Sequence, residues 1–105
     1  MPLTLIRPLE PRVTYPPEHD EDWWDHPFIV EAYARRNVGL FLRAWREAHW
    51  PERISQARTA RWLAMTQATL SLIETGLRRV SEDERVRWLE ILHVPASMIR
   101  EWVQP

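Results

Sequence analysis

An all-α fold is what this sequence predicts, and three observations support that prediction. Apolar residues recur at spacings of three and four along most of the chain, which is the period of an amphipathic helix. Several of these stretches begin just after Ser, Thr or Asp, the residue types that cap helix N-termini. No stretch has the alternating pattern of a strand, and the chain contains no internal repeat.

Residues 1–26 are predicted to form a proline-rich, acidic arm. Five prolines fall within the first 17 positions, and proline removes a backbone donor and blocks helix formation. The arm also contains apolar residues that a plain disordered tail would have less often, so packing on its own domain, packing on a partner and disorder all remain open. His19 and His26 stand among aspartates at a spacing that matches no metal motif, and we expect a capping and linker segment without a metal there.

Residues 27–37 are predicted to form an extra helix that leads into the main domain. We expect Asp25 to cap this helix, because it is followed by a proline at position 27 that suits the first helical turn. The apolar positions that recur at helical spacing are Phe28, Ile29, Ala32 and Tyr33. The helix either ends near Asn37 and Gly39 or continues into the next one.

Residues 38–103 are predicted to contain five short helices. We expect these helices at 38–48, 56–63, 67–75, from Ser81 to about His93, and 96–103. Proline at positions 51 and 95 ends two of them, because the residue before a proline disfavours the helical region.

Capping residues support these helix boundaries. Ser55 and Thr66 are expected N-caps, and Ser81 with Glu84 has the spacing of a capping box. Gly76 is expected to end the helix before it in the left-handed conformation.

Composition limits the classes of function. At 105 residues the chain is one small domain with an arm, and it has no cysteine for a disulfide or a thiolate metal site. No apolar run is long enough to cross a membrane, and the N-terminus does not have the pattern of a signal peptide. The four histidines have no nucleophile or carboxylate at motif spacing, so we predict neither an enzyme nor a bound cofactor.

Positive charge is concentrated in the middle of the chain. In residues 38–80 seven arginines stand against three glutamates, which gives +4, although the whole chain carries −1. A basic central segment suits a surface that meets nucleic acid, and an ordinary solvated surface is the competing interpretation.

The motifs of this central segment resemble the lambda-repressor/Cro-like, or XRE-type, helix-turn-helix family. The relevant stretches are VGLFLRAWREA, ISQARTARWLAMTQATLSLIETGLRRVS and LEILHVP. Positions in register with the family are Ser55-Gln56, Ala60, Thr66-Gln67, Ile73-Glu74 and Gly76. The resemblance covers residues 38–103 and implies a five-helix DNA-binding domain. Departures from the family pattern occur at Thr59, usually apolar, at Ala64, often glycine, and at Leu72, often basic or polar.

In this family the second helix of the motif enters the major groove of DNA. Carried over to this chain, the resemblance implies that the base-facing residues are Gln67, Ala68, Thr69 and Ser71. The residues that it places near phosphates are Gln56, Thr66, Arg78 and Arg79. Arg43, Arg58 and Arg61 are weaker candidates, and a solvated helix face explains Arg43 and Arg61 equally well.

A single unit of this kind reads only a few base pairs, so we expect a homodimer on a palindromic site in double-stranded DNA. Candidate dimer or partner contacts are Trp23, Trp24, Ile99, Trp102 and Val103. Of the seven tryptophans, the core is expected to take Trp45, Trp62 and Trp88, whereas the surface is expected to expose Trp23, Trp24, Trp50 and Trp102.

The resulting hypothesis is a sequence-specific transcriptional regulator, a repressor, that acts in the cytoplasm of a bacterium or for a phage. Two alternatives remain open. One is an antitoxin-type autorepressor that binds a protein through its arm. The other is a protein-interaction module that keeps the fold without binding DNA, an idea favoured by the acidic Glu74 and the absence of arginine in the recognition helix.

Overall fold

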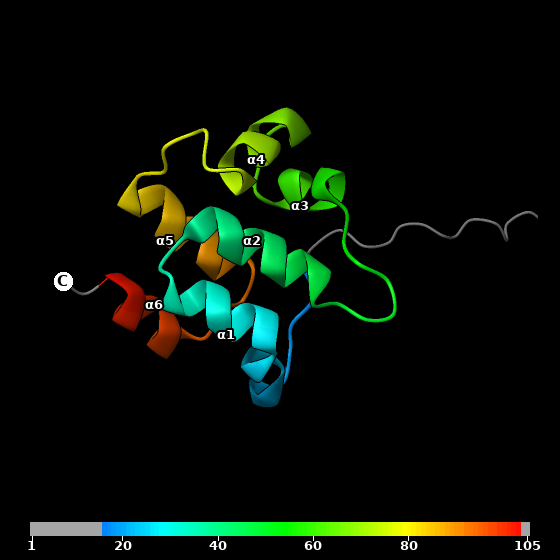
Figure 1. Ribbon diagram of the computed structural model, residues 1–105, viewed down its shortest axis with the longest axis vertical. Helices are drawn as coiled ribbons and strands as arrows, with labels where there is room; N and C mark the ends of the chain where they lie inside the picture. The colour runs from blue at the N-terminus through cyan, green and yellow to red at the C-terminus, as the bar shows by residue number, and fades with distance from the viewer. Residues whose placement is uncertain (1–15, 104–105) are drawn as a thin grey trace, which may run out of the picture.

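The computed structural model describes residues 16–103, and every regular element in this part of the chain is a helix (Figure 1). Its elements in chain order are η2 (Glu21–Asp25), α1 (Pro27–Ala34), α2 (Val38–Glu47), α3 (Gln56–Trp62), α4 (Gln67–Glu74), α5 (Glu82–Ile91) and α6 (Ala96–Val103). The predicted all-α fold, with five helices after an extra one, is therefore confirmed. Of the arm predicted over residues 1–26, residues 1–15 lie outside the described range, and η2 lies within the remainder.

The helix starts follow the predicted capping residues with one exception. The side chains of Ser55, Thr66 and Ser81 each accept a backbone N–H in the first turn of the helix that follows. Ser81 and Glu84 form the predicted capping box, and the Ser81 backbone N–H, followed by Arg78, lowers the pKa of the Glu84 carboxyl.

The exception is α1, for which the prediction of Asp25 as N-cap is wrong. His26 takes that place, and its Nδ1 accepts the N–H of Phe28 at 3.1 Å. Asp25 instead ends η2. Asn37 caps α2, so the extra helix and α2 are separate elements.

Four helices are followed by a residue in the left-handed backbone conformation, namely Arg36, Ala64, Gly76 and His93. Gly76 has φ of 81°, and its N–H and that of Leu77 bond the carbonyls of Ile73 and Leu72, which closes α4 as predicted. Ala64, in the turn between α3 and α4 where the family often has glycine, has φ of 60°.

Helix α2 lies at the centre of the fold, between α1 on one side and α4 on the other (Figure 1). Its side chains Phe41, Leu42 and Trp45 are fully buried, so α2 supplies the middle of the core. Gly39 is where α2 and α4 approach most closely. A Cβ built at this position would lie 2.0 Å from the carbonyl oxygen of Ile73, so only glycine allows this backbone-to-backbone contact.

The segment before α1 is attached to α2 by aromatic rings. His19 stacks on Trp23 with ring centroids 3.7 Å apart, and its Nε2 lies 2.9 Å from Nε2 of His49. Because Nδ1 of His49 donates to the carbonyl of Trp45, Nε2 of neutral His49 accepts a hydrogen bond from the Nε2–H of His19. Trp24 is buried and packs edge-on against His19, with ring centroids 5.9 Å apart.

This arrangement corrects several expectations about exposed aromatic and apolar residues. Trp24 and Trp102 are each only 5% exposed, so the prediction that they lie on the surface is wrong. Ile99 is buried with them, and none of the three presents a surface to a partner. The reason is tertiary: η2 and α6 fold back on the central helices and carry these side chains into the core. Trp50 is 90% exposed, and Trp45 and Trp88 are core residues, as predicted.

The histidine pair predicts a pH-dependent stability. Burial, followed by the charge of His49, lowers the pKa of His19 to about 4, and burial also lowers the pKa of His49. Both groups are therefore neutral in the folded protein at a pH where the unfolded chain, with a histidine pKa near 6.5, binds protons. Their contribution to the free energy of unfolding is complete above pH 6.5 and falls as the pH drops toward 4.

Urea denaturation at pH 7 and pH 5 measures this effect. We expect the midpoint of the wild-type chain to fall more between these pH values than that of a His19→Gln/His49→Gln variant, because carboxylates contribute equally to both proteins. Equal falls in the two proteins would contradict the assignment.

Candidate nucleic-acid interface

Helices α3 and α4 pack against each other at one edge of the molecule, away from α1 and α6 (Figure 1). The turn between them is short because Ala64 adopts its left-handed conformation and the N–H of Met65 bonds the carbonyl of Ala60 at 2.9 Å. The apolar side chains that fix the two helices face inward and are Ala60, Leu63, Leu70 and Ile73.

The opposite side of α4 presents the residues that sequence reasoning placed toward bases. Gln67 and Ala68 are exposed, and Thr69 and Ser71 are half-buried. The hydroxyl of Thr69 accepts a hydrogen bond from the hydroxyl of Thr66 at 2.9 Å. The first turn of α4 therefore presents a short row of small polar side chains, held in place by the N-cap.

An ion pair inside the domain supports this surface from behind. Arg46 of α2 donates two hydrogen bonds, at 2.7 and 2.8 Å, to the carboxylate of Glu74, and the two side chains are only 12% and 3% exposed. Arg46 also donates to the carbonyl of Ile54 at 3.1 Å, before α3 begins. This ion pair links α2, α4 and the segment leading into α3.

The same carboxylate positions the first residue of α3. Gln56 donates its amide N–H to Glu74 at 2.9 Å, and the side-chain oxygen of Gln56 lies 3.5 Å from the side-chain nitrogen of Gln67. A row of contacts thus runs from buried Arg46 through Glu74 and Gln56 to exposed Gln67.

Sequence reasoning missed the role of Glu74. It counted this residue as a surface charge on the recognition helix, whereas its carboxylate points inward to Arg46. The two residues are 28 positions apart, and no local spacing connects them. The available signal was an acidic residue next to the buried Ile73 in a segment otherwise rich in arginine.

The candidate phosphate contacts differ in their exposure and in whether another group already pairs with them. Arg79 is exposed and has no carboxylate partner within residues 16–103. Arg78 is half-buried and pairs with Glu84 at 3.2 Å, so a phosphate would have to compete with that carboxylate. The hydroxyl of Thr66 is used in capping, and Gln56 is half-buried at the start of α3.

The weaker arginine candidates also differ. Arg43 pairs with Glu47 at 3.2 Å, whereas Arg58 and Arg61 are exposed on α3. Arg58 and Arg61 therefore extend the basic surface next to α4 more readily than Arg43 does.

Leu72 is 45% exposed on α4 and Leu77, which follows the helix, is 77% exposed. Their backbones are joined by the bond that closes α4. Of this apolar pair, Leu72 stands where the family resemblance implied a basic or polar residue.

Other kinds of site have less support in the described part of the chain. No group of three or more histidine, aspartate or glutamate side chains there could hold a metal ion. The helices of residues 16–103 are also too short and too polar to cross a membrane. The polar face of α3 and α4, which is held by the N-cap of α4 and by the ion pair of Glu74, is therefore the candidate site with the most structural support.

Comparison with known proteins agrees with this geometry. A family model described as a helix-turn-helix domain matches residues 37–102, which is most of the described chain. No curated protein matches. No solved structure matches either.

Proposed function

Because this chain belongs to the helix-turn-helix domain family, within its lambda-repressor-like class, we propose that it is a sequence-specific DNA-binding transcriptional regulator. Helix α4 enters the major groove, and its first turn meets the base edges. Action as a cytoplasmic repressor in a bacterium or phage belongs to the same proposal.

The observation that carries this proposal is the supported row of amides. Exposed Gln67 lies at the start of α4, and Gln56 beside it is held by Glu74. An amide in a fixed orientation can make two hydrogen bonds to adenine in the major groove, which discriminates by roughly 1–3 kcal/mol against a wrong base. Such support limits the freedom of the side chain that reads the base, which is what a specific contact needs.

A pair of substitutions separates base reading from phosphate contact. Gln67→Ala is expected to relax preference at one base pair of each half-site by about tenfold or more, and to leave binding to random DNA unchanged. Arg79→Ala is expected to weaken binding to all sequences alike and to lower the slope of log affinity against log salt by about 0.9. Fluorescence anisotropy with a selected site and a scrambled site, each at several salt concentrations, measures both effects. The same loss on both DNA molecules for Gln67→Ala would contradict its role as a base contact.

We also propose that the chain binds DNA as a homodimer on a palindrome, because one unit reads few bases. Of the residues nominated from sequence, Trp23 and Val103 keep partial exposure. Leu72 and Leu77 add an exposed apolar pair beside α4. A light-scattering mass of one chain at binding concentrations, with an affinity that does not depend on protein concentration, would contradict dimer binding.

The interaction-module alternative loses its main argument, because Glu74 does not face outward. One observation still favours a protein partner in addition to DNA: the indole of Trp50 is 90% exposed. An antitoxin-type regulator would use such a surface, and its DNA binding would survive Trp50→Ala while its protein binding would fall.

A further inference from the structure

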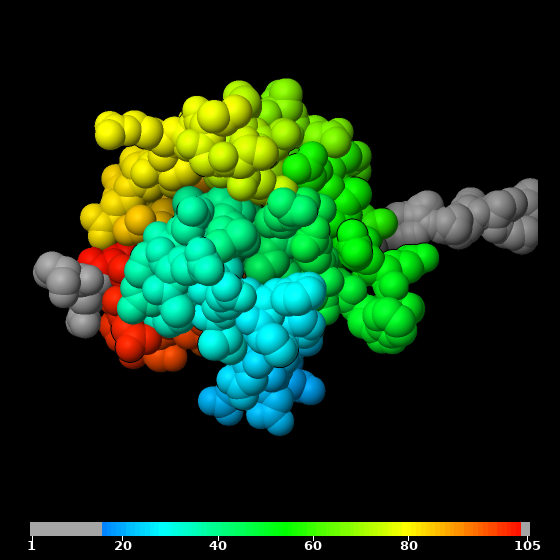
Figure 2. Space-filling view, viewed as in Figure 1, coloured from blue at the N-terminus to red at the C-terminus, as the bar shows by residue number. Residues whose placement is uncertain are grey.

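A second basic site lies at the C-terminal end of α4, whereas the row of polar side chains lies in the first turn of that helix. It is a cavity of about 320 Å³ between the junction of α1 with α2 and the segment that follows α4. In Figure 2 the cyan atoms of that junction border the yellow atoms of the segment. Four arginines line it, namely Arg35, Arg36, Arg78 and Arg85.

No carboxylate lines this cavity, and two of its four arginines pair with carboxylates that lie outside the lining. Arg35 pairs with Glu31 at 2.9 Å and Arg78 pairs with Glu84 at 3.2 Å. Arg36 and Arg85 have no carboxylate partner among residues 16–103. Two like charges facing one small space repel each other, and an anion between them would relieve that repulsion.

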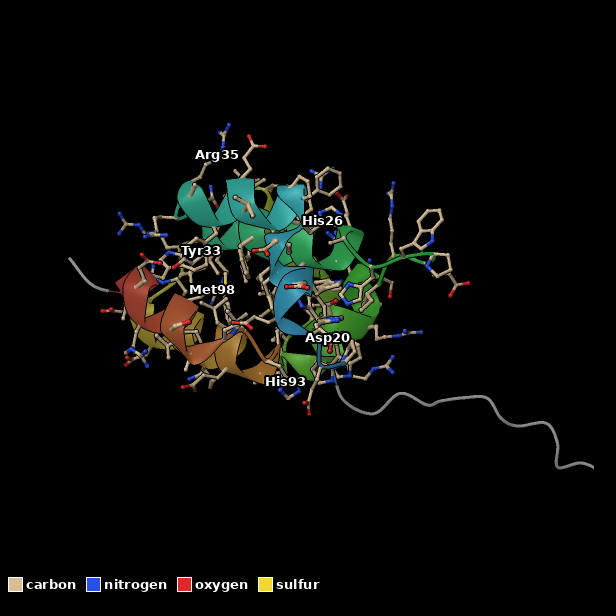
Figure 3. All side chains as sticks on the ribbon, turned by 90° about the horizontal axis from the view of Figure 1, so that it is seen from below. Asp20, His26, Tyr33, Arg35, His93 and Met98 are labelled. Carbon is tan, nitrogen blue, oxygen red and sulfur yellow. The ribbon has the colours of Figure 1, made fainter. Side chains whose placement is uncertain are left out.

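Aromatic rings hold these two arginines in place. The guanidinium of Arg36 lies 4.5 Å from the ring centre of Tyr33, and that of Arg85 lies 5.9 Å from the ring centre of Trp102. The two rings pack edge to face at 5.4 Å. Tyr33 is fixed in turn by its hydroxyl, which lies 2.7 Å from the carboxylate of Glu101 and 3.0 Å from the carbonyl of Met98, and Figure 3 shows Tyr33 beside Met98 of α6.

Stacking on a ring leaves the edge of a guanidinium free to donate hydrogen bonds. Arg36 uses one N–H on the carbonyl of Tyr33 at 3.0 Å, and its others are available. The Nε of Arg85 is buried and has no hydrogen-bond partner in the described structure. A buried donor without a partner is costly, so a ligand that accepts a hydrogen bond from this Nε–H would be stabilising.

The start of α2 adds to the positive potential. Asn37 caps the N–H of Leu40, while the N–H groups of Val38 and Gly39 belong to the first turn, which has no intrahelical acceptor for them. Both residues line the cavity. The positive end of a ten-residue helix thus faces the same space as the four arginines.

We propose that this pocket binds a phosphate group. Several guanidinium donors with fixed orientation suit a doubly charged, multi-oxygen anion better than a halide or a single carboxylate. The phosphate comes either from the DNA backbone beyond the α4 contacts or from a small phosphorylated molecule, and both sources offer the same chemistry. Arg78 belongs to this pocket and to the proposed DNA surface, so the two sites adjoin.

Calorimetric titration of the full chain with inorganic pyrophosphate, without DNA and at constant ionic strength, tests this proposal. We expect saturable binding that falls at least about tenfold in an Arg36→Gln/Arg85→Gln variant. The control is Arg87→Gln/Arg100→Gln, which removes the same charge from exposed positions outside the pocket and should bind as the wild type does.

The single variant Arg36→Gln keeps the test valid if loss of Arg85 unfolds the domain, because Arg36 is exposed on a turn. It should weaken pyrophosphate binding without lowering the thermal midpoint of the ligand-free protein. Absence of saturable binding to wild type, or equal weakening in the pocket variant and the control, would overturn the proposal.

A second titration identifies the source of the phosphate. If pyrophosphate lowers affinity for DNA more than sodium chloride of equal ionic strength, the pocket contacts the DNA backbone. If it binds without lowering DNA affinity, the pocket serves a separate phosphorylated molecule. Both outcomes support a phosphate site. The calorimetric titration without DNA gives its result whether or not the chain binds DNA.

Discussion

Gly39→Ala is expected to destabilise the domain by about 1–3 kcal/mol or more, although alanine forms helices better than glycine does by about 1 kcal/mol. The added methyl group would lie 2.0 Å from the carbonyl oxygen of Ile73 and 3.1 Å from Cα of Glu74. Both atoms belong to the backbone of α4 and cannot rotate away. Helices α2 and α4 would have to separate, and the buried contacts between them would loosen.

Urea denaturation measures the free energy of unfolding of Gly39→Ala, with Gly76→Ala as the comparison. Gly76 has φ of 81° and no atom within 4 Å of an added Cβ, so alanine there meets conformational strain but no steric clash. Strain of that kind costs roughly 1–2 kcal/mol. A Gly39→Ala protein at least as stable as the wild type would show that α2 and α4 do not approach as described.

Glu74→Ala is expected to cost about 3–5 kcal/mol of stability, because it leaves the guanidinium of Arg46 largely buried without its carboxylate. It also frees Gln56, so DNA specificity should weaken in whatever protein remains folded. The matched control is Glu47→Ala, which breaks a more exposed pair, with side chains 58% (Arg43) and 25% (Glu47) exposed, and should cost less than about 1 kcal/mol.

A double substitution separates the two roles of Glu74. Replacing the pair with apolar residues, as in Arg46→Met/Glu74→Leu, should recover much of the stability, because buried ion pairs are often replaced by apolar packing without loss. The amide support of Gln56 would still be missing. Denaturation and DNA titration of this variant are therefore expected to disagree, with stability restored and base preference still reduced.

Equal losses of unfolding free energy in Glu74→Ala and its control Glu47→Ala would contradict the buried network.

Local signals made most of the fold predictable. Ser55, Thr66 and Ser81 cap helices by bonding their own first turns, and Gly76 ends α4 through its own backbone conformation. Such interactions join residues three to five positions apart, so both partners can be recognised within a short stretch of sequence. The choice between Asp25 and His26 as the cap of α1 was missed, because both residue types can accept a backbone N–H.

The site was less predictable, because its support depends on contacts between distant segments. The ion pair between Arg46 and Glu74 joins two helices. It buries the carboxylate of Glu74, which the sequence predicts to be a surface charge. Trp24 and Trp102 were expected at the surface and lie in the core, since only the packing of η2 and α6 decides which tryptophans are covered. The contact between His19 and His49 is of the same kind.

Selection of bound sites from random double-stranded DNA tests the central claim most directly. The account predicts enrichment of a palindrome whose half-sites lie about 34–36 Å apart or a multiple of that distance, as two copies of α4 on one face of the duplex require. Gln67→Ala should enrich the same palindrome with one position in each half-site relaxed. Failure of the wild-type chain to enrich any sequence, with no salt-dependent binding to DNA, would contradict the account.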